Sequence, residues 1–309
     1  MTQSVAPLSD LKRSGRGVSK KGSLTRQNNR IGLLATLPAF LVVACLLFLP
    51  ICYAVGISFY KTDGVTFKFI WLKNYLSIFT SPIVHQVFVT NLKFLIAIPF
   101  VILLATLCSV LLYEKIFGWK FFRVVFFLPT VLSTSVIGLM FRSAFSFEGP
   151  VNAGLAKLHH APINFFSSGN TAIFVVLLAL IWSGFGYASI ILLAGLMAID
   201  PDIFSAAEVD GAGWWQKVRF ITVPSIRGQL AFVAIINILY TFTSLFGFIF
   251  VMTAGGPLYS TTTLDYLIFQ KAFSSNDMGQ GSALAILVFG IISALTLTQS
   301  RYLTGKARD

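Results

Sequence analysis

Long apolar runs separated by short polar stretches dominate the sequence. Each of six runs reaches or approaches the roughly 20 residues that an α-helix needs to cross the apolar core of a bilayer. The runs are Ile31–Phe59, Val87–Tyr113, Phe121–Phe141, Thr171–Ile199, Gln229–Thr253 and Gly281–Leu303. Pro99 and Pro129 lie inside two of them, and bends there are tolerable because neighbouring helices can satisfy the freed backbone groups. The pattern predicts an all-α integral membrane protein with about six transmembrane helices.

The composition agrees with this pattern. Of the 309 residues, 56% are hydrophobic and only 11% are charged, whereas an average soluble domain is about a quarter charged. Composition therefore indicates a membrane protein before any motif is considered.

The net charge of +12 is unevenly distributed, because seven of the 23 Lys and Arg residues fall within the first 30 positions. We interpret residues 1–28 as a disordered basic cytoplasmic tail and residues 29–309 as the transmembrane domain. A basic tail can bind nucleic acid, but beside apolar spans it is more typical of a topology signal next to anionic lipid. No nucleic-acid partner is predicted.

The Lys and Arg residues also predict the orientation of the spans. If the N-terminus is cytoplasmic, 16 of the 23 lie on the cytoplasmic side, and seven lie outside or within a span. Cytoplasmic loops carry the excess of positive charge. We therefore expect both termini in the cytoplasm, together with the loop between the fourth and fifth spans, residues 200–227, which we call the central loop.

The central loop has the signals of a helix, a break and a second helix. Asp200 is a suitable N-cap and Pro201 suits the first helical position. Asp210-Gly211 is a turn signal, because glycine tolerates a positive φ. A second short helix is expected over Trp214–Ile221, with Pro224 ending it. A bent, semi-polar element between two spans is suited to docking on another protein.

The same loop resembles the "EAA" loop of permease subunits of binding-protein-dependent ABC importers. The family pattern is Glu-Ala-Ala, three residues, Gly, nine residues, Ile, one residue and Leu-Pro. This chain departs from it at Ser205, where Glu is usual, and at Val223, where Leu is usual. The resemblance implies a cytoplasmic coupling helix that contacts an ATPase subunit. The residues it implicates are Ser205, Ala206, Ala207, Glu208, Asp210, Gly211, Ala212 and Pro224.

Catalytic patterns do not emerge from the sequence. We find no Ser/His/Asp set, no close carboxylate pair in a span, no metal-binding HExxH and no phosphate-binding loop. We therefore expect a transport subunit without enzyme activity, metal or cofactor of its own. Its energy would come from partner subunits that bind ATP and Mg, or from an ion gradient.

Polar and aromatic residues inside the spans are candidates for a solute site, because burying them in lipid is costly. Hydroxyl groups can hydrogen-bond a sugar, and aromatic rings can cover its C–H faces. Such residues also serve helix packing and interfacial anchoring. The Trp-x-Gly-Phe-x-Tyr stretch resembles the sugar-site segment of the large permease subunit of maltose-type importers. The resulting candidate solute-binding residues are Thr134, Trp182, Gly184, Tyr187, Thr241 and Ser244.

Taken together, the resemblance implies the permease subunit of a sugar importer in a prokaryotic cell membrane. Its expected partners are a second permease subunit, two ATP-binding cassette subunits, an external solute-binding protein and the lipid bilayer. One alternative is a different solute, such as glycerol-3-phosphate. Others are an ion-coupled secondary transporter, which the scarcity of carboxylates in the spans disfavours, and a membrane scaffold without transport activity.

Overall fold

The computed structural model describes residues 35–305. The predicted basic tail, residues 1–28, lies outside the described residues. The chain divides after Ala54 into two units. At the end of the first unit, the helix Ala35–Ile57 includes the π-helical turn η1 (Ala44–Phe48) and runs on through α2 (Leu49–Ile57), which crosses the boundary.

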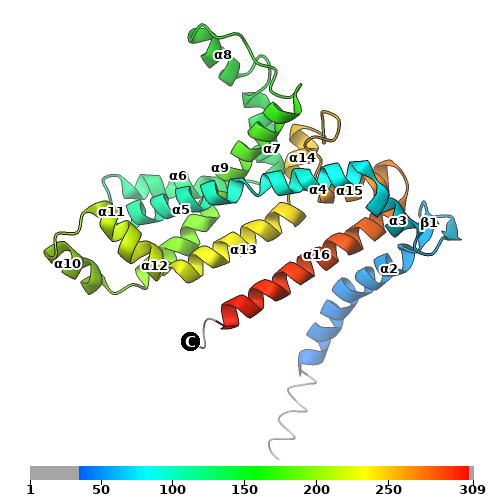
Figure 1. The fold of residues 1–309 in the computed structure, drawn as a ribbon, viewed down its shortest axis with the longest axis horizontal. Helices are drawn as coiled ribbons and strands as arrows, with labels where there is room; N and C mark the ends of the chain where they lie inside the picture. Colours follow the sequence, from blue (N-terminus) through cyan, green and yellow to red (C-terminus); the bar gives the residue numbers. More distant parts are fainter. Residues whose placement is uncertain (1–34, 306–309) are drawn as a thin grey trace, which may run out of the picture. The chain divides into compact units, whose positions relative to one another are not determined.

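Three further helical segments of the second unit are long and apolar enough to cross a membrane. They are α4 (Pro82–Phe94) with α5 (Ala97–Tyr113), α9 (Gly169–Met197) and α16 (Met278–Gly305). Figure 1 shows α5 lying beside α9. The Ser109 hydroxyl on α5 donates to the Ser189 carbonyl of α9 at 3.0 Å. Small side chains at this contact let the two backbones approach closely, as is usual between transmembrane helices.

The third predicted span is broken. Its two parts, α6 (Trp119–Val131) and α7 (Thr134–Ala144), meet at 103°, so the span expected over Phe121–Phe141 is interrupted. The break does not fall at Pro129, which stays inside α6. It falls where Leu132 and Ser133 are extended and the Ser133 hydroxyl accepts a hydrogen bond from the Val136 N–H, capping α7.

The fifth predicted span is broken as well. A 71° bend at Ile226 separates the helix Trp214–Ser225 from α13 (Arg227–Thr243). A second break precedes α14 (Phe246–Met252), so the continuous helix expected over Gln229–Thr253 was wrong. The Asp265 carboxylate stabilises this second break, because it accepts a hydrogen bond of 2.6 Å from the Phe246 N–H at the start of α14. Within residues 35–305, the count of candidate spans is four, or six if each bent pair is one span.

The connections contain structure that the apolar pattern did not predict. Strands β1 (Tyr60–Thr62) and β2 (Phe67–Phe69) form an antiparallel hairpin, so the chain is not purely helical. Asp63 holds the hairpin turn by accepting hydrogen bonds from the N–H groups of Thr66 and Val65, and these bonds lower the pKa of its carboxyl to about 2. The other connecting helices are α3 (Lys73–Thr80), α8 (Pro150–Lys157), α15 (Leu264–Phe269) and the π-helix η3 (Gln270–Ser274).

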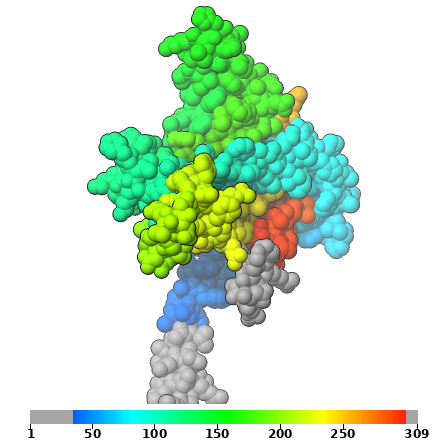
Figure 2. All heavy atoms as spheres, turned by 60° about the vertical axis from the view of Figure 1, so that its left-hand side comes forward, coloured from blue at the N-terminus to red at the C-terminus, as the bar shows by residue number. Residues whose placement is uncertain are grey.

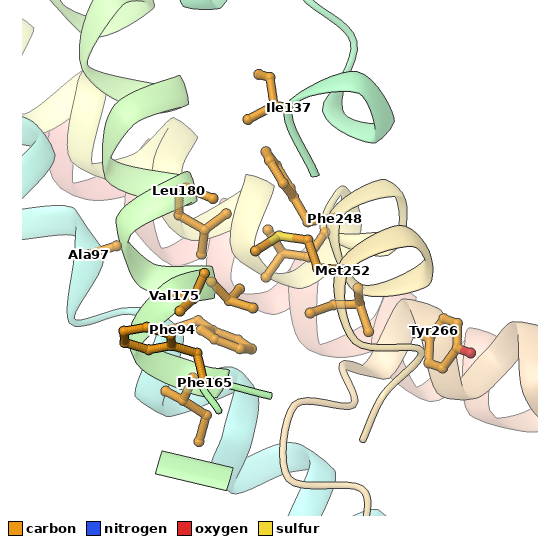
Figure 3. Packing of buried hydrophobic residues seen from close by; sticks show 14 residues of the cluster. Phe94, Ala97, Ile137, Phe165, Val175, Leu180, Phe248, Met252 and Tyr266 are labelled. Carbon is orange, nitrogen blue, oxygen red and sulfur yellow. The ribbon is translucent and has the colours of Figure 1, made fainter. Parts of the chain in front are cut away.

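Buried apolar side chains join the broken spans to the straight ones. In Figure 3, Val175 and Leu180 of α9 face Phe248 and Met252 of α14. The polar Asn91 of α4 is fully buried nearby, where its amide group donates to the Thr241 carbonyl and accepts from the Leu264 N–H, both at 2.8 Å. Satisfying both halves of a buried amide avoids a desolvation penalty of about 1–3 kcal/mol and fixes α4 against α13 and α15.

Candidate functional site

A cavity of about 330 Å³ lies where the break between α6 and α7 faces the middle of α9 and α13. We call it the central cavity. No acidic or basic side chain is among its lining residues, which are Pro129, Thr130, Leu132, Thr134, Ile137, Ser183, Gly184, Tyr187, Ile236, Asn237 and Tyr240. The lining is thus apolar with a few hydroxyl and amide groups, which is the usual composition of a site for a small neutral molecule.

Two glycines shape the wall that α9 contributes to the cavity. At Gly184, a Cβ would lie 3.3 Å from Val101 of α5 and 3.5 Å from the Asn237 amide oxygen of α13, so three helices converge at this point. At Gly186, a Cβ would fall on the Phe126 carbonyl oxygen of α6. The absence of side chains at these positions lets α6 and α13 approach α9 and enclose the cavity.

Hydrogen-bonding capacity remains available in the cavity. The Asn237 amide nitrogen donates to the Val233 carbonyl at 2.9 Å, and the Ser183 hydroxyl donates to the Leu180 carbonyl at 3.1 Å. Both oxygens can still accept a hydrogen bond from a bound molecule. Among the described residues, the Thr134 and Tyr187 hydroxyls have no protein partner, and the Tyr187 side chain is half exposed. The cavity therefore presents donors and acceptors on an otherwise apolar wall.

Three of the six solute-binding candidates line the cavity, namely Thr134, Gly184 and Tyr187. The other three lie elsewhere. The Trp182 ring packs in the apolar core, with its centroid 5.9 Å from that of Phe141. Thr241 is buried with its hydroxyl bonded to the Asn237 carbonyl, and Ser244 ends α13 beside Thr243.

Ser183, Asn237 and Tyr240 also line the cavity, although they were not selected from the sequence. Ser183 and Tyr187 are four residues apart on α9, while Asn237 and Tyr240 are three apart on α13. Residues at these spacings share one helix face. Grouping the polar residues of each span by this spacing would have selected both pairs. Only the structure separates Asn237 from Ser244, because Ser244 is seven residues further on and lies where α13 ends.

The central loop forms a second distinctive region. Helix α10 (Pro201–Val209) begins at Asp200, whose carboxylate accepts a hydrogen bond from the Asp202 N–H, and it is followed by α11 (Trp214–Lys217). The helix, break and helix expected from the sequence are therefore present. Figure 2 shows this segment, in yellow-green, on the surface of the second unit.

The turn between α10 and α11 is closed by two backbone hydrogen bonds. The Gly211 N–H donates to the Glu208 carbonyl at 3.0 Å, and the Ala212 N–H donates to the Ala207 carbonyl at 2.9 Å. This is a Schellman motif, which requires a left-handed residue, and Gly211 has φ +77°. The Asp210-Gly211 signal in the sequence thus corresponds to a defined reversal of the chain rather than to a loose connection.

Charged and aromatic side chains tie the loop together and to α5. The Lys217 ammonium donates to the Glu208 carboxylate at 2.7 Å, and this hydrogen bond lowers the pKa of Glu208. The Trp214 indole N–H lies 2.8 and 2.9 Å from the two carboxylate oxygens of Glu114, just after α5. Tyr113 and Phe204 bring their ring centroids to 5.7 Å. These contacts hold α10 and α11 against the end of α5.

The second helix of the loop does not end at Pro224 as expected. It continues through the π-helix η2 (Val218–Thr222) and α12 (Val223–Ser225), with Pro224 in the first turn of α12. Proline lacks an N–H and clashes with the carbonyl four residues earlier in a regular α-helix. The wider π-helical turn immediately before it removes that conflict, and the chain bends two residues later, at Ile226.

The outer surface of the loop is apolar where the helices reverse. Val209 and Trp215 are 89% and 69% exposed, and Ile203 is also exposed. Ser205, Ala206 and Glu208 are exposed on the same short helix. An exposed apolar surface bordered by polar residues is typical of a protein–protein contact.

Comparison with known proteins identifies the class to which this chain belongs. The family model described as "Binding-protein-dependent transport system inner membrane component" matches residues 75–308. The chain belongs to this family, and it is accordingly an ABC-type permease of a bacterial inner membrane. This membership favours the importer over both the ion-coupled transporter and the scaffold considered from the sequence.

Individual relatives match over most of the chain. The sulfoquinovosyl glycerol transport system permease protein SmoG of Agrobacterium fabrum is 32% identical, over 89% of this chain and 91% of its own. The multiple sugar-binding transport system permease protein MsmF of Streptococcus mutans is 30% identical, over 85% and 94%. A crystal structure of a bacterial ABC transporter that imports alginate has a similar fold, with a TM-score of 0.77 at 20% identity, covering 91% of this chain and 98% of that one.

Proposed function

We propose that this protein is the permease subunit of a sugar importer, in which the central cavity contacts the solute and the central loop docks on an ATPase subunit. A second permease subunit completes the pathway, two ATPase subunits bind at the cytoplasmic side, and an external binding protein delivers the solute. In this arrangement both termini and the central loop are cytoplasmic.

The observation that carries the proposal is the direct connection of the two regions along the chain. The central cavity is bounded by α9 and α13, and the central loop is the segment that joins these two helices. Displacement of α10 and α11 by an ATPase is therefore transmitted directly to both helices. Transport coupled in this way needs an element that the ATPase can move between two positions. The helix reversal at Gly211 is closed by hydrogen bonds, so it can move as one stiff element.

The lining of the cavity supports a neutral carbohydrate as the solute. A phosphate group bound away from water needs cationic partners, and the cavity has none among its lining residues. This argues against glycerol-3-phosphate, whereas Asn237, Ser183 and the tyrosines suit sugar hydroxyls and C–H faces. The sugar-binding system named for one relative is in keeping with this choice.

Replacing Gly211 tests the coupling role. Proline fixes φ near −65°, so Gly211→Pro cannot adopt the observed φ of +77° and also lacks the N–H that donates to the Glu208 carbonyl. We expect normal membrane insertion but loss of solute uptake and of solute-stimulated ATP hydrolysis in the reconstituted complex.

Gly213→Ala is the matched control, because Gly213 has φ −67° and a Cβ there would make only ordinary contact. This variant should transport normally. Uptake by Gly211→Pro at the rate of the control would contradict the coupling role of the loop.

A further inference from the structure

A second recess lies beside the central loop, and the proposed function does not use it. It has a volume of about 570 Å³ and lies between the end of α5, the start of α6 and the end of α9. We call it the basic groove. Its lining residues are Leu112, Tyr113, Lys115, Trp119, Arg123, Leu193, Met197, Ile199 and Pro201. Figure 2 shows the start of α6 and the α10 segment on the same face.

The groove has two cations and no acidic lining residue. Within residues 35–305, neither Lys115 nor Arg123 forms an ion pair. The nearest acid in sequence, Glu114, has both carboxylate oxygens engaged by the Trp214 indole N–H. Glu114 does not line the groove, so the two cations have no direct acidic partner among the described residues and favour an anionic ligand.

Exposed aromatic residues near the groove suit the depth of lipid headgroups. Phe117 and Phe121 flank Trp119 in sequence and are 101% and 69% exposed. Tryptophan and other aromatic side chains with neighbouring cations are typical of the membrane–water interface. The rest of the lining is largely apolar and includes Leu193 and the exposed Met197 of α9.

From these features, we infer that the basic groove binds the headgroup and upper acyl chains of an anionic phospholipid, such as phosphatidylglycerol. Lys115 and Arg123 contact the phosphate, Trp119 lies at the glycerol level, and the apolar wall covers the acyl chains. The orientation rests on the proposed function, which places the groove in the cytoplasmic leaflet, where basic pockets between helices bind anionic headgroups.

The bound lipid would contact the start of the central loop. Pro201, the first residue of α10, lines the groove. Tyr113, which also lines it, packs against Phe204 of α10 with ring centroids 5.7 Å apart and the rings tilted at 44°. An anionic lipid in the groove therefore supports α10 from the membrane side and stabilises the position in which the loop meets its partner.

The test measures lipid retained by the full chain, purified with its partner subunits in detergent, by native mass spectrometry without nucleotide or solute. Phosphatidylglycerol and phosphatidylcholine of the same chain length are compared. Each interfacial cation contributes roughly fivefold to the affinity for an anionic lipid. The double variant Lys115→Gln/Arg123→Gln should therefore bind phosphatidylglycerol about thirtyfold more weakly, while its affinity for phosphatidylcholine should change little.

Lys120→Gln is the matched control, because Lys120 lies in the same turn with its ammonium 5.9 Å from the Trp119 ring centroid but does not line the groove. The affinity of this variant for phosphatidylglycerol should fall by no more than about fivefold. If the double variant does not fold, 0.5 M salt should release phosphatidylglycerol but not phosphatidylcholine from the unaltered protein, because salt screens exposed charges.

Several outcomes would overturn the inference. Equal retention of the two lipids by the unaltered protein would contradict it. A loss of phosphatidylglycerol in the double variant no greater than in the control variant would contradict it as well. Displacement of the lipid by millimolar inorganic phosphate would show that the acyl chains contribute nothing. Loss of the ATPase subunits with lipid retention intact would assign the groove to a protein interface. Gly211→Pro should retain the lipid while losing uptake, so failure of the proposed function would be seen separately.

Discussion

Helix α9 and the broken spans around it differ in sequence and in task. Helix α9 runs without proline for 29 residues, and its glycines let α5, α6 and α13 approach it closely. The pairs α6–α7 and α13–α14 are each interrupted near the cavity. Non-helical backbone at membrane depth is tolerated only where protein buries it or where it lines a cavity. The difference indicates that the straight helix acts as scaffold, while the interruption between α6 and α7 contributes to the wall of the cavity.

The largest expected effect concerns the break between α13 and α14. Asp265 accepts hydrogen bonds from the Phe246 and Tyr266 N–H groups and from the Thr263 hydroxyl, so it caps the starts of both α14 and α15. Hydrogen bonds to a charged group contribute about 1.5–3 kcal/mol each. Asp265→Ala should lower the free energy of unfolding by about 3 kcal/mol, measured by SDS titration of the purified chain.

Asp265→Asn keeps the volume and part of the acceptor capacity, so it should recover about half of that loss. An alanine variant as stable as the unaltered protein would mean that the broken span does not need this carboxylate.

The contact between straight and broken helices gives the next effect. A Cβ at Gly186 would overlap the Phe126 carbonyl oxygen and approach Thr130 of α6, so Gly186→Ala must push α6 away from α9. Overpacking of this kind costs about 1–3 kcal/mol. The loss should appear in the same SDS titration.

Gly290→Ala in α16 is the comparison, because nothing lies within 4 Å of a Cβ at that position. Alanine there should stabilise the helix by about 0.5–1 kcal/mol. If both substitutions stabilise the protein, close approach to α9 is not what holds α6 in place.

Within the cavity, a change of hydrogen bonding should affect transport more than stability. Asn237→Leu removes the amide that faces Gly184. Loss of one hydrogen bond to a solute is about 1.4 kcal/mol, or tenfold in solute affinity of the transporter. Uptake at limiting solute should fall accordingly. Thr243→Val, an exposed position on the same helix outside the cavity lining, should leave uptake unchanged.

The smallest effect concerns the pH dependence of the central loop. Lys217 lowers the pKa of Glu208 below its ordinary value of 4.5. The ion pair therefore contributes fully above pH 4.5 and is lost as the pH falls through the lower value of the folded loop. Amide exchange in α10 and α11, corrected for the intrinsic rate, should rise modestly below that pH. A Glu208→Gln variant should show the higher exchange rate at every pH. If the exchange rate of the unaltered protein does not change with pH, the ion pair between Lys217 and Glu208 does not stabilise the central loop.

Sequence alone determined the membrane class, the positions of the apolar segments and the helix reversal at Asp210-Gly211. These follow from local properties, since hydrophobic length, capping residues and a glycine with positive φ act within a few positions along the chain. The resemblance carried by the central loop likewise agreed with the family to which the chain belongs.

Only the tertiary structure decided where the spans break and which polar residues share a cavity. Ser133 is a suitable N-cap, but Pro129 is the stronger breaking signal and yet remains helical, so the sequence did not choose between the two positions. In the structure the break falls at Leu132 and Ser133, and α7 packs against α14. Trp182 and Tyr187 belong to one motif, yet one ring enters the core and the other faces the cavity. Five residues along a helix turn a side chain to another face, and only the neighbouring helices determine what each face meets.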